Sequence, residues 1–474
     1  MLNDTISAVS SPRGKGGVAI IRISGKDALP IIRKIFRMKG TRPLEETPRV
    51  ARLGHILAES GTGDGSLVPI DTVLVLFFPG PHSFTGEDVV EINCHGGPLL
   101  TETVYRSTLF AGARAALPGE FTRRAFLNGK INLTEAESLG LMLEAQTESQ
   151  LQIASAGLME NSPLRTFITQ TTESLTSLLA SVYVKIDYPE EDLAEMTEEQ
   201  MKAELQAHIT RLQSLKQTRK TGHAVVDGIK TVLCGKTNAG KSSIYNRLVM
   251  RDAAIVTDIP GTTRDILHER ISMGPLLLDL SDTAGLREAE DADLIEKIGI
   301  ERSKNALKRA ELILLVLDAS APLDANDLTI CEWVADRDVP VAILLNKIDK
   351  GQVSLSDRLA EIFKGKTPPP PVFPVSARTG EGLDALTDWL VGQFVDGNLD
   401  FAKHAILFND RQDANIRQAL NHLQQAKEAL EDHCPTDMVC SSVELAIQAL
   451  GEMDGRMVNE EIIQTIFSKF CVGK

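Results

Sequence analysis

The 474-residue sequence lacks any apolar run that approaches the roughly 20 residues needed to cross a bilayer. Its N-terminus has no apolar core of the kind that a secretion signal requires. It also lacks an excess of positive charge, since 50 Lys and Arg stand against 65 Asp and Glu, a formal net charge of −15. This balance excludes a protein that coats nucleic acid or an anionic membrane through charge alone, so any RNA contact must be local. We therefore expect a cytoplasmic globular protein of roughly three domains.

Cysteine is also scarce, and its spacing indicates neither a disulfide framework nor a zinc site. The six cysteines, at positions 94, 234, 331, 434, 440 and 471, form no Cys-x-x-Cys pair and no His/Cys ligand spacing. Cys234 lies in an apolar run and is predicted to be a core residue. Cys471 stands at the prenylation position, but Gly473 is not aliphatic and no polybasic run precedes it, which excludes a lipid anchor.

What the sequence does contain is a phosphate cradle at residues 235–242. An apolar run from Thr231 to Cys234 predicts a strand, the motif Gly-x-x-x-x-Gly-Lys-Ser follows it, and residues 244–249 continue with helical spacing. Glycines let backbone N–H groups turn towards an anion, and the N-terminus of the following helix adds a positive dipole. Lys241 is predicted to reach the β- and γ-phosphates of a nucleotide, and the Ser242 hydroxyl to bind Mg²⁺.

Residues 222–395 alternate short apolar runs with helical patterns, which predicts a mainly parallel sheet. After the cradle, the predicted strands are 276–282, 311–318, 339–347 and 372–376. Ligands bind beyond the carboxyl ends of such strands, and three further motifs lie there. They are Asp282-Thr283-Ala284-Gly285, Asn346-Lys347-Ile348-Asp349 and Ser376-Ala377-Arg378.

The carboxylate of Asp349 determines which nucleotide is predicted. Guanine displays N–H donors at N1 and N2, to which one carboxylate can bond with both oxygens, whereas adenine has an acceptor at N1. GTP is therefore predicted rather than ATP. Asp282 is expected to orient Mg²⁺ through water, the Gly285 N–H to contact the γ-phosphate, and the segment Ser376–Arg378 to donate a backbone N–H to guanine O6.

Hydrolysis needs an oriented water and a neutralised transition-state charge, often supplied by a Gln after the Asp-x-x-Gly motif and by an arginine finger. Here the residue after Gly285 is Leu286, which cannot orient water. Asn238 and the segment Thr257–Asp265 offer enough oxygens for a monovalent cation to replace the finger, and Thr263 is the predicted second Mg²⁺ ligand. The alternative is a plain switch loop, in which Gly and Thr only permit motion.

An α+β domain is predicted over residues 1–118. Its Val- and Ile-rich runs, bounded by Gly and Pro, predict strands at 17–24, 49–59, 69–78 and 89–94, with helices at 27–36 and 99–110. Three basic residues follow it, Arg123, Arg124 and Lys130. They could meet a phosphate or a carboxylate, but an ordinary solvated face is the favoured alternative.

Long helices are predicted from Leu133 onwards, starting at a capping box formed by Thr134 and Glu137. The helical pattern is interrupted at 188–192 and returns after residue 395, at 416–430, 442–450 and 459–470. The predicted fold is thus a multidomain α/β protein: a P-loop GTPase domain inserted into an all-helical domain, with its two chain connections close together. The predicted division is 1–118 (α+β), 119–221 (helical, first part), 222–395 (GTPase) and 396–474 (helical, second part).

Together these motifs resemble the tRNA modification GTPase family MnmE (TrmE), and the likeness covers the whole chain. In the GTPase part it rests on Asn238–Ser243, Ile255–Asp265, Asp282–Arg287 and Ile298–Arg302. Outside that part it rests on Gly16–Val18, Arg22–Gly25, Ser83–Glu91, His95–Pro98, Pro118–Lys130 and Phe470–Lys474. Other potassium-type GTPases share the middle motifs but not these flanks.

The resemblance implies an N-terminal domain that is similar to folate-dependent one-carbon enzymes, forms a homodimer and binds 5-formyl- or 5,10-methylene-tetrahydrofolate. Its implied folate contacts are Arg22, Glu91, Lys130 and Lys474, with Cys471 nearby. The implied K⁺ ligands are Asn238, Thr257, Ile259 and Thr262, and the Mg²⁺ ligands are Ser242 and Thr263. The motifs and the resemblance together give the GTP-binding residues Asn238, Ala239, Gly240, Lys241, Ser242, Ser243, Thr257, Asp258, Ile259, Pro260, Gly261, Thr262, Thr263, Asp282, Thr283, Ala284, Gly285, Asn346, Lys347, Asp349, Ser376, Ala377 and Arg378.

Glu296 matches the family's water-activating glutamate, because it precedes the motif Lys297-Ile298-Gly299. The linker before it is longer than usual in the family, so Glu288 and Glu290 remain alternatives, as does a surface role for Glu296. The family acts with the FAD- and NADH-using protein MnmG (GidA) to install an aminomethyl or carboxymethylaminomethyl group on C5 of wobble uridine in tRNA. A different function, ribosome assembly with GTP as a timer, would call for a basic RNA-reading module such as a KH domain, and the acidic C-terminal helices carry no GXXG loop.

Overall fold

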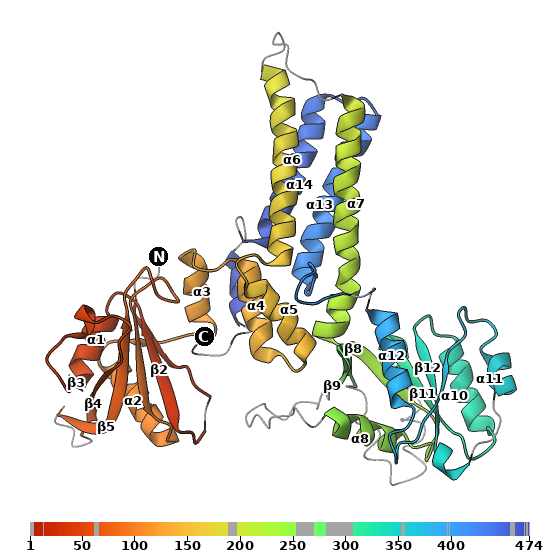
Figure 1. Ribbon diagram of the computed structural model, residues 1–474, viewed down its shortest axis with the longest axis horizontal. Helices are drawn as coiled ribbons and strands as arrows, with labels where there is room; N and C mark the ends of the chain where they lie inside the picture. Colours follow the sequence, from red (N-terminus) through yellow and green to blue (C-terminus); the bar gives the residue numbers. More distant parts are fainter. Residues whose placement is uncertain are drawn as a thin grey trace. The chain divides into compact units, whose positions relative to one another are not determined.

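The computed structural model describes residues 4–12, 14–60, 66–187, 197–252, 270–280, 307–351, 356–395, 397, 399–455, 460–468, 470 and 473. The chain forms two compact units (Figure 1). Unit 1 contains Met1–Gly140 and Gly451–Lys474, and unit 2 contains Leu141–Leu450. None of the described helices combines the length and the apolar composition that a membrane span requires.

A seven-stranded sheet forms the base of unit 1, in the order β3-β4-β5-β6-β2-β1-β7. All neighbouring pairs are antiparallel except β1 with β7. The strands are β1 (Ile6–Val9), β2 (Val18–Ser24), β3 (Phe36–Met38), β4 (Arg52–Glu59), β5 (Leu67–Phe78), β6 (Val89–His95) and β7 (Arg114–Ala115). The strands predicted at 17–24, 49–59, 69–78 and 89–94 are confirmed, whereas the short strands β1, β3 and β7 were not predicted.

Two helices, α1 (Ala28–Ile35) and α2 (Pro98–Phe110), pack on one face of this sheet. The alternation of β2 explains which face they cover, since its Ala19, Ile21 and Ile23 are buried in the same core as the helices. Side chains of opposite parity remain exposed, among them Val18, Leu53 and Leu74. One face of the sheet is therefore covered by α1 and α2. On the other face Phe121 covers Ile6 and Ala8 of β1, whereas the β4–β5 part, which we call the open face, carries large exposed apolar side chains.

Three further helices pack the C-terminal segment against the N-terminal part of unit 1. They are α3 (Glu120–Leu127), α4 (Leu133–Glu144) and α15 (Glu460–Ser468). Leu133 and Ala136 of α4 pack with Ile463 and Phe467 of α15 in one apolar cluster. The C-terminal segment thus belongs to the same packed unit as the N-terminal sheet.

The capping box predicted for α4 is wrong by two residues. Asn132 Oδ1 accepts from the Glu135 N–H (2.8 Å), and Glu135 Oε2 accepts from the Asn132 N–H (2.8 Å). Thr134 instead donates its hydroxyl to the Met453 carbonyl at 2.9 Å. Asn132 with Glu135 and Thr134 with Glu137 both match the capping pattern. Thr134 does not cap the helix because its hydroxyl is hydrogen-bonded to Met453.

The helical part of unit 2 is a bundle of long helices (Figure 1). Polar contacts join them in pairs, for example Lys427 to Gln206 (2.9 Å) and Tyr183 to Glu444 (2.7 Å). The helices are α5 (Glu148–Leu158), α6 (Pro163–Asp187), α7 (Glu198–Gly222), α13 (Asp410–Glu431) and α14 (Thr436–Met453). They confirm the predicted helical pattern; the predicted interruption at 188–192 lies outside the described residues.

The α/β part of unit 2 has a six-stranded sheet in the order β13-β12-β11-β8-β10-β9. Its pairs are parallel except β9 with β10, which confirms the predicted mainly parallel sheet. The strands are β8 (Ile229–Cys234), β9 (Arg270–Met273), β10 (Leu276–Asp279), β11 (Leu312–Asp318), β12 (Val341–Asn346) and β13 (Val372–Pro374). The helices are α8 (Lys241–Asp252), α10 (Ala325–Ala335), α11 (Ser356–Ile362) and α12 (Leu383–Phe394).

The two chain connections between the helical and α/β parts lie against each other, as predicted. The Leu407 N–H donates to Thr218 Oγ1 at 3.1 Å. A Cβ added to Gly222 would lie 1.9 Å from the Leu407 carbonyl oxygen, so only glycine allows this approach. A short π-helix, η2 (His223–Asp227), follows α7, and its Val225 carbonyl accepts from Gln150 Nε2 at 3.0 Å. The α/β part is thus inserted into the helical part through one compact junction.

Candidate functional site

The cradle begins where β8 ends, at the centre of the unit 2 sheet. Cys234, the last residue of β8, is buried, which confirms its predicted core position. Gly235 follows with φ +147°, and a Cβ there would lie 2.2 Å from the Val316 carbonyl oxygen of the neighbouring strand β11. The first glycine of the motif is therefore required by both its backbone angle and the close approach of β11.

Lys241 starts α8 and folds its side chain back over the cradle. Its ammonium group donates to the carbonyl oxygens of Gly235 (2.7 Å) and Lys236 (2.9 Å). Burial lowers the pKa of Lys241. Ser242 and Ser243 stand exposed in the first turn of the helix, where the helix dipole favours an anion. A cation next to exposed hydroxyls and helix N–H groups is the arrangement that a nucleotide phosphate and its metal ion require.

Asn346, the last residue of β12, links the cradle to the segment predicted to contact guanine O6. Its Nδ2 donates to the Ala239 carbonyl at 3.0 Å, and its Oδ1 accepts from the Ala377 N–H at 3.1 Å. The side chain is almost fully buried, with 1% of the residue exposed. A Cβ on Gly240 would lie 2.1 Å from Asn346 Nδ2, so the second glycine of the motif leaves room for this link. One buried amide thus holds two of the predicted nucleotide-binding segments in register.

Lys347 provides a second link between the end of β12 and the cradle. Its backbone has a left-handed φ of +69°, which turns the side chain back towards the cradle. Its ammonium group donates to the Asn238 carbonyl and to Asp318 Oδ2, both at 2.6 Å. Burial alone would raise the pKa of Asp318, but the Lys347 ammonium and two hydrogen bonds from Ser320 lower it to about 2. Asn238 itself has φ +65°, so this turn of the cradle is held in an uncommon conformation by the lysine.

Asp349 lies beside the segment Ser376–Arg378, which is predicted to contact guanine O6. Its Oδ1 accepts from the Ser376 hydroxyl and its Oδ2 from Arg378 Nε, both at 2.9 Å. The Ser376 hydrogen bond, with a further contribution from Arg378, lowers the pKa of Asp349. The carboxylate is therefore ionised and held in one orientation, as an acceptor for two N–H donors must be.

Several predicted site residues lie outside the described residues. They are the switch and potassium-loop residues 257–263, the residues Asp282–Gly285, the catalytic candidate Glu296 with its alternatives Glu288 and Glu290, and Cys471 and Lys474 near the C-terminus. For Thr257, Ile259, Thr262, Thr263 and Glu296 the sequence-based assignments stay predictions.

A second candidate site lies in unit 1, where β2 and β6 pair Arg22 with Glu91. Glu91 Oε1 accepts from Arg22 Nε (2.9 Å) and Nη2 (2.7 Å), and both side chains are about one-fifth exposed, at 22% and 21%. The guanidinium carbon lies 5.8 Å from the ring centroids of both Phe84 and Phe121. The pair thus combines opposite charges with aromatic walls at an accessible position.

Lys130 lies beside the loop that carries Phe84, and the C-terminal segment lies beside β1. Lys130 is exposed, and a Cβ on Gly86, two residues from Phe84, would lie 3.3 Å from its Cγ. At the C-terminus, the Ser10 hydroxyl donates to the Gly473 carbonyl at 3.1 Å. Ser10 follows directly after β1, which pairs with β2 through Ala8 and Arg22. The residue before Lys474 therefore lies beside the β1–β2 pair that also holds Arg22.

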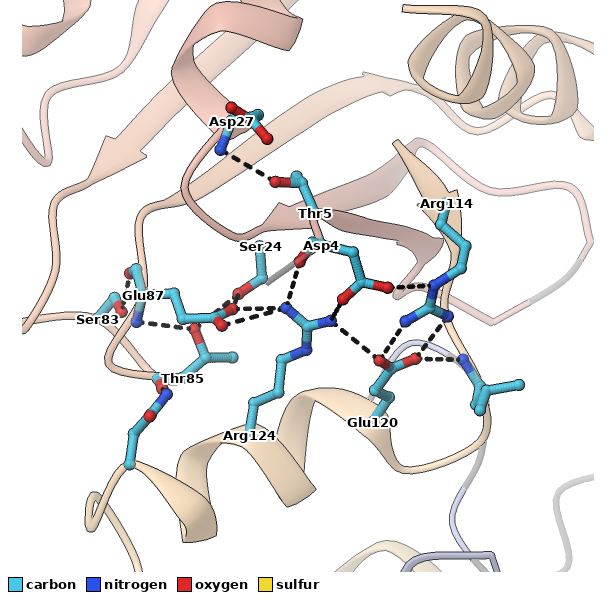
Figure 2. Close-up of polar contacts among 12 residues, drawn as sticks. Asp4, Thr5, Ser24, Asp27, Ser83, Thr85, Glu87, Arg114, Glu120 and Arg124 are labelled. Atoms are coloured by element: carbon cyan, nitrogen blue, oxygen red, sulfur yellow. Dashed lines mark hydrogen bonds and ion pairs between the residues drawn. The ribbon is translucent and has the colours of Figure 1, made fainter. Parts of the chain in front are cut away.

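The favoured interpretation of Arg124 as part of a solvated face is wrong. Figure 2 shows its guanidinium between Glu87 on one side and Glu120 on the other, with Asp4 close by. The ion pairs measure 3.1 Å to Glu87, 3.0 Å to Glu120 and 2.8 Å to Asp4. Only 1% of Arg124 is exposed, because carboxylates from the N-terminal segment, the loop before β6 and α3 itself surround the charge. Arg114 adds a second cation, at 2.6 Å from both Asp4 and Glu120.

The roles of two polar residues, one in the cradle and one linked to it through Lys347, were not predicted from the sequence. Asp318 is the last residue of β11 and binds Lys347. Because it lies at the carboxyl end of a buried strand, where ligands bind, it could have been predicted as a site residue. Lys236 occupies a variable position of the cradle motif and pairs with Asp327 at the start of α10. The capping pattern of Asp324 and Asp327 could have predicted the start of that helix, but not its contact with the cradle.

Comparisons with known proteins cover the chain almost completely. Residues 5–130 match the family described as "GTP-binding protein TrmE N-terminus", and residues 133–471 match the "MnmE helical domain". The protein named tRNA modification GTPase MnmE from Symbiobacterium thermophilum is 40% identical over 477 residues, covering all of both chains. Its namesake from Carboxydothermus hydrogenoformans is 38% identical over all of both chains, and that from Lactococcus lactis subsp. lactis is 39% identical over 99% of this chain and 98% of its own.

Proposed function

The chain belongs to the MnmE family of tRNA modification GTPases, and from this membership we propose that it binds GTP at the cradle and hydrolyses it to GDP and phosphate during tRNA modification. The observation that carries this proposal is the Asn346 link, which joins the phosphate cradle at Ala239 to the guanine-facing segment at Ala377. Two segments that must contact opposite ends of one nucleotide are thereby held together by a single buried side chain.

Guanine selection is assigned to Asp349. The Ser376 and Arg378 contacts keep this carboxylate ionised and oriented, which supports bidentate recognition of guanine N1–H and N2–H. Asp349→Asn keeps the shape but converts one acceptor into a donor, which fits xanthine, with its N1–H donor and C2 carbonyl acceptor. Nucleotide titration should show weaker GTP binding and stronger XTP binding by the variant, with ATP bound by neither protein. Unchanged GTP affinity would remove Asp349 from the site.

Magnesium and potassium are proposed as the ions of the reaction. The exposed Ser242 hydroxyl at the start of α8 is a hard oxygen donor beside the phosphate position, which fits Mg²⁺, with Thr263 as the second protein ligand. Asn238 is exposed on the same cradle, and with Thr257, Ile259 and Thr262 it would supply amide, hydroxyl and carbonyl oxygens to K⁺. Bound K⁺ would supply positive charge for the transition state in place of an arginine finger. Glu296 is proposed to orient the attacking water.

A tetrahydrofolate derivative, 5-formyl or 5,10-methylene, is proposed as the ligand of unit 1. A pterin ring needs flat apolar walls and an acceptor for its N–H groups, and the folate tail carries carboxylates. The Arg22–Glu91 pair beside Phe84 offers such an acceptor and wall, and Lys130 and Lys474 offer cations for the tail. Calorimetry on Glu91→Ala should show lost folate binding with GTP hydrolysis intact. Joint loss of both would instead indicate misfolding.

The open face of the unit 1 sheet is proposed to mediate a homodimer. Leu53 and Leu74 are 45% and 44% exposed there, and the β4–β5 register sets them opposite each other. Apolar side chains on an uncovered sheet face favour burial against a second surface. We also retain the division of the chain into residues 1–118, 119–221, 222–395 and 396–474 as the proposed functional domains.

The complete reaction is proposed to modify C5 of wobble uridine in tRNA, giving an aminomethyl or carboxymethylaminomethyl group in the cytoplasm. In this proposal the folate supplies a one-carbon unit, the FAD-dependent MnmG (GidA) is the protein partner, and GTP hydrolysis drives the cycle. The support is the match to relatives named tRNA modification GTPase over the full length of the chain. Comparing the modified nucleosides of wobble-uridine tRNAs in cells with and without this protein tests the substrate; an unchanged nucleoside profile contradicts it.

A further inference from the structure

The cradle is fixed to α10 through one of its variable positions, Lys236. The Lys236 ammonium donates to Asp327 Oδ2 at 2.6 Å and to Asp324 Oδ2 at 3.1 Å. The Lys236 side chain is 21% exposed and that of Asp327 only 2%, whereas Asp324 is 53% exposed. The short, shielded contact with Asp327 is therefore the stronger of the two, because little water competes for it.

Asp327 has little freedom to move away from this contact. It forms a capping box with Asp324, in which each side chain accepts a backbone N–H of the other residue, at 3.0 and 3.2 Å. Its second oxygen, Oδ1, is buried and has no hydrogen-bond partner among the described residues. The Lys236 ammonium consequently compensates most of the charge of a buried carboxylate, and the hydrogen bond to Asp327 is the main cause that raises the pKa of Lys236.

The same lysine also meets the phosphate-binding residue of the cradle through its backbone. The Lys236 carbonyl accepts from the Lys241 ammonium at 2.9 Å, next to the Gly235 carbonyl at 2.7 Å. The later part of the cradle is held by Asn346 and Lys347, which bind the carbonyls of Ala239 and Asn238. Its first part is held to α10 by the Lys236 side chain.

We propose that Lys236 is a positioning residue for GTP binding and hydrolysis, which acts by fixing the first part of the cradle to the buried Asp327 so that Lys241 faces the phosphates. This inference rests on the proposed binding of GTP at the cradle. A cradle held in one geometry before the nucleotide arrives loses less entropy on binding, and a loosened one binds both GDP and GTP less tightly. The competing role is a direct contact of Lys236 with the γ-phosphate, which would affect GTP and spare GDP.

The test uses the full-length protein, four test variants and one control variant. Lys236→Met removes the charge and keeps most of the apolar stem, Lys236→Arg keeps the charge, Asp327→Asn neutralises the anchor, and the fourth combines Lys236→Met with Asp327→Asn. Asp324→Ser serves as the matched control, because serine retains the N-cap acceptor but removes the exposed charge. GDP and the slowly hydrolysed analogue GTPγS are titrated by calorimetry, which reports affinity and the active fraction separately.

Lys236→Met is expected to weaken GDP and GTPγS by a similar factor of about tenfold, with unchanged stoichiometry. Lys236→Arg should restore most of the affinity, Asp324→Ser should stay within about twofold of the wild type, and the double variant should lose less than the product of the two single losses. If Lys236→Met does not fold, the loss in Asp327→Asn decides the question. Wild-type affinity in Lys236→Met, or a loss confined to GTPγS, overturns the inference. A wild-type protein that binds neither nucleotide refutes the proposed function instead.

Discussion

Removing the amide of Asn346 should damage nucleotide binding more than overall folding. Asn346→Ala breaks the hydrogen bonds to the Ala239 carbonyl and the Ala377 N–H, at 3.0 and 3.1 Å. Ala239 is fully buried, so water cannot replace the lost donor, whereas Ala377 is half-buried and can be rehydrated. A buried carbonyl without a hydrogen-bond donor costs roughly 1–3 kcal/mol. If the nucleotide-free cradle changes shape to give this carbonyl a partner, nucleotide binding must reverse that change, and affinity falls by about 5- to 150-fold.

Asn346→Asp separates the two hydrogen bonds. The aspartate retains an acceptor for the Ala377 N–H, but it sets a carboxylate oxygen against the Ala239 carbonyl, and two acceptors repel each other. We therefore expect Asn346→Asp to be at least as damaging as Asn346→Ala. Fluorescent GDP titrations of both variants, with melting curves to confirm folding, supply the comparison. Wild-type affinity in Asn346→Asp would refute the reasoning, because the Ala239 contact would then contribute nothing.

Three further outcomes follow from other parts of the chain. Arg124→Met removes the cation that Glu87, Glu120 and Asp4 share, but Arg114 still pairs with Asp4 and Glu120, so the variant should destabilise unit 1 by roughly 1–3 kcal/mol, seen as faster amide exchange in α3; unchanged exchange contradicts this. Asp227 raises the pKa of His223, so this stabilisation is complete below the unfolded pKa of about 6.5 and is lost as the pH rises through the folded value. The melting temperature of unit 2 should accordingly fall over that range, and less so in His223→Gln; an identical pH profile in the variant would exclude His223. Glu296→Ala should lower the kcat of GTP hydrolysis and leave GTP affinity unchanged. If Glu288→Ala lowers kcat and Glu296→Ala does not, Glu288 in the linker is the water-activating residue instead.

The elements that the sequence predicted are those with a long, regular pattern. The strand at 311–318 and the helix at 99–110 each show a sustained pattern, and both are found with small shifts at their ends. Strands β1, β3 and β7 have only 4, 3 and 2 residues, too few for a period to be visible. Their pairing is decided by neighbouring strands, which the local sequence does not contain.

Arg124 illustrates why burial of a charge was not predictable from its neighbours. The local segment has the pattern of a polar helix face. Two of the three carboxylates around the guanidinium, those of Asp4 and Glu87, are far away in the sequence. Thr134 failed as a helix cap for a similar reason, because the Met453 carbonyl that takes its hydroxyl is 319 positions away. Both outcomes depend on tertiary contacts that no window of the sequence includes.

At the nucleotide site, the sequence predicted which residues meet but not how they are joined. The motifs ending β8 and β12 had to meet at one edge of a parallel sheet, and Asn346 and Lys347 do contact the cradle there. The specific links, from Asn346 to Ala239 and from Lys347 to Asp318, depend on the register of β11 with β12. A motif gives residue types at strand ends, whereas hydrogen-bond partners require the positions of the neighbouring strands.

Phosphate release from GTP in KCl and in NaCl tests the central claim, a GTPase with a potassium-assisted cradle, most directly. The full-length protein with Mg²⁺ should release phosphate from GTP and not from ATP, because Asp349 is proposed to bind the two N–H donors that only guanine displays. The rate should be higher in KCl than in NaCl at equal ionic strength, because a site lined by Asn238 and the 257–262 segment is proposed to select the larger ion. Equal rates in the two salts would contradict the potassium site, and equal hydrolysis of ATP would contradict the guanine site.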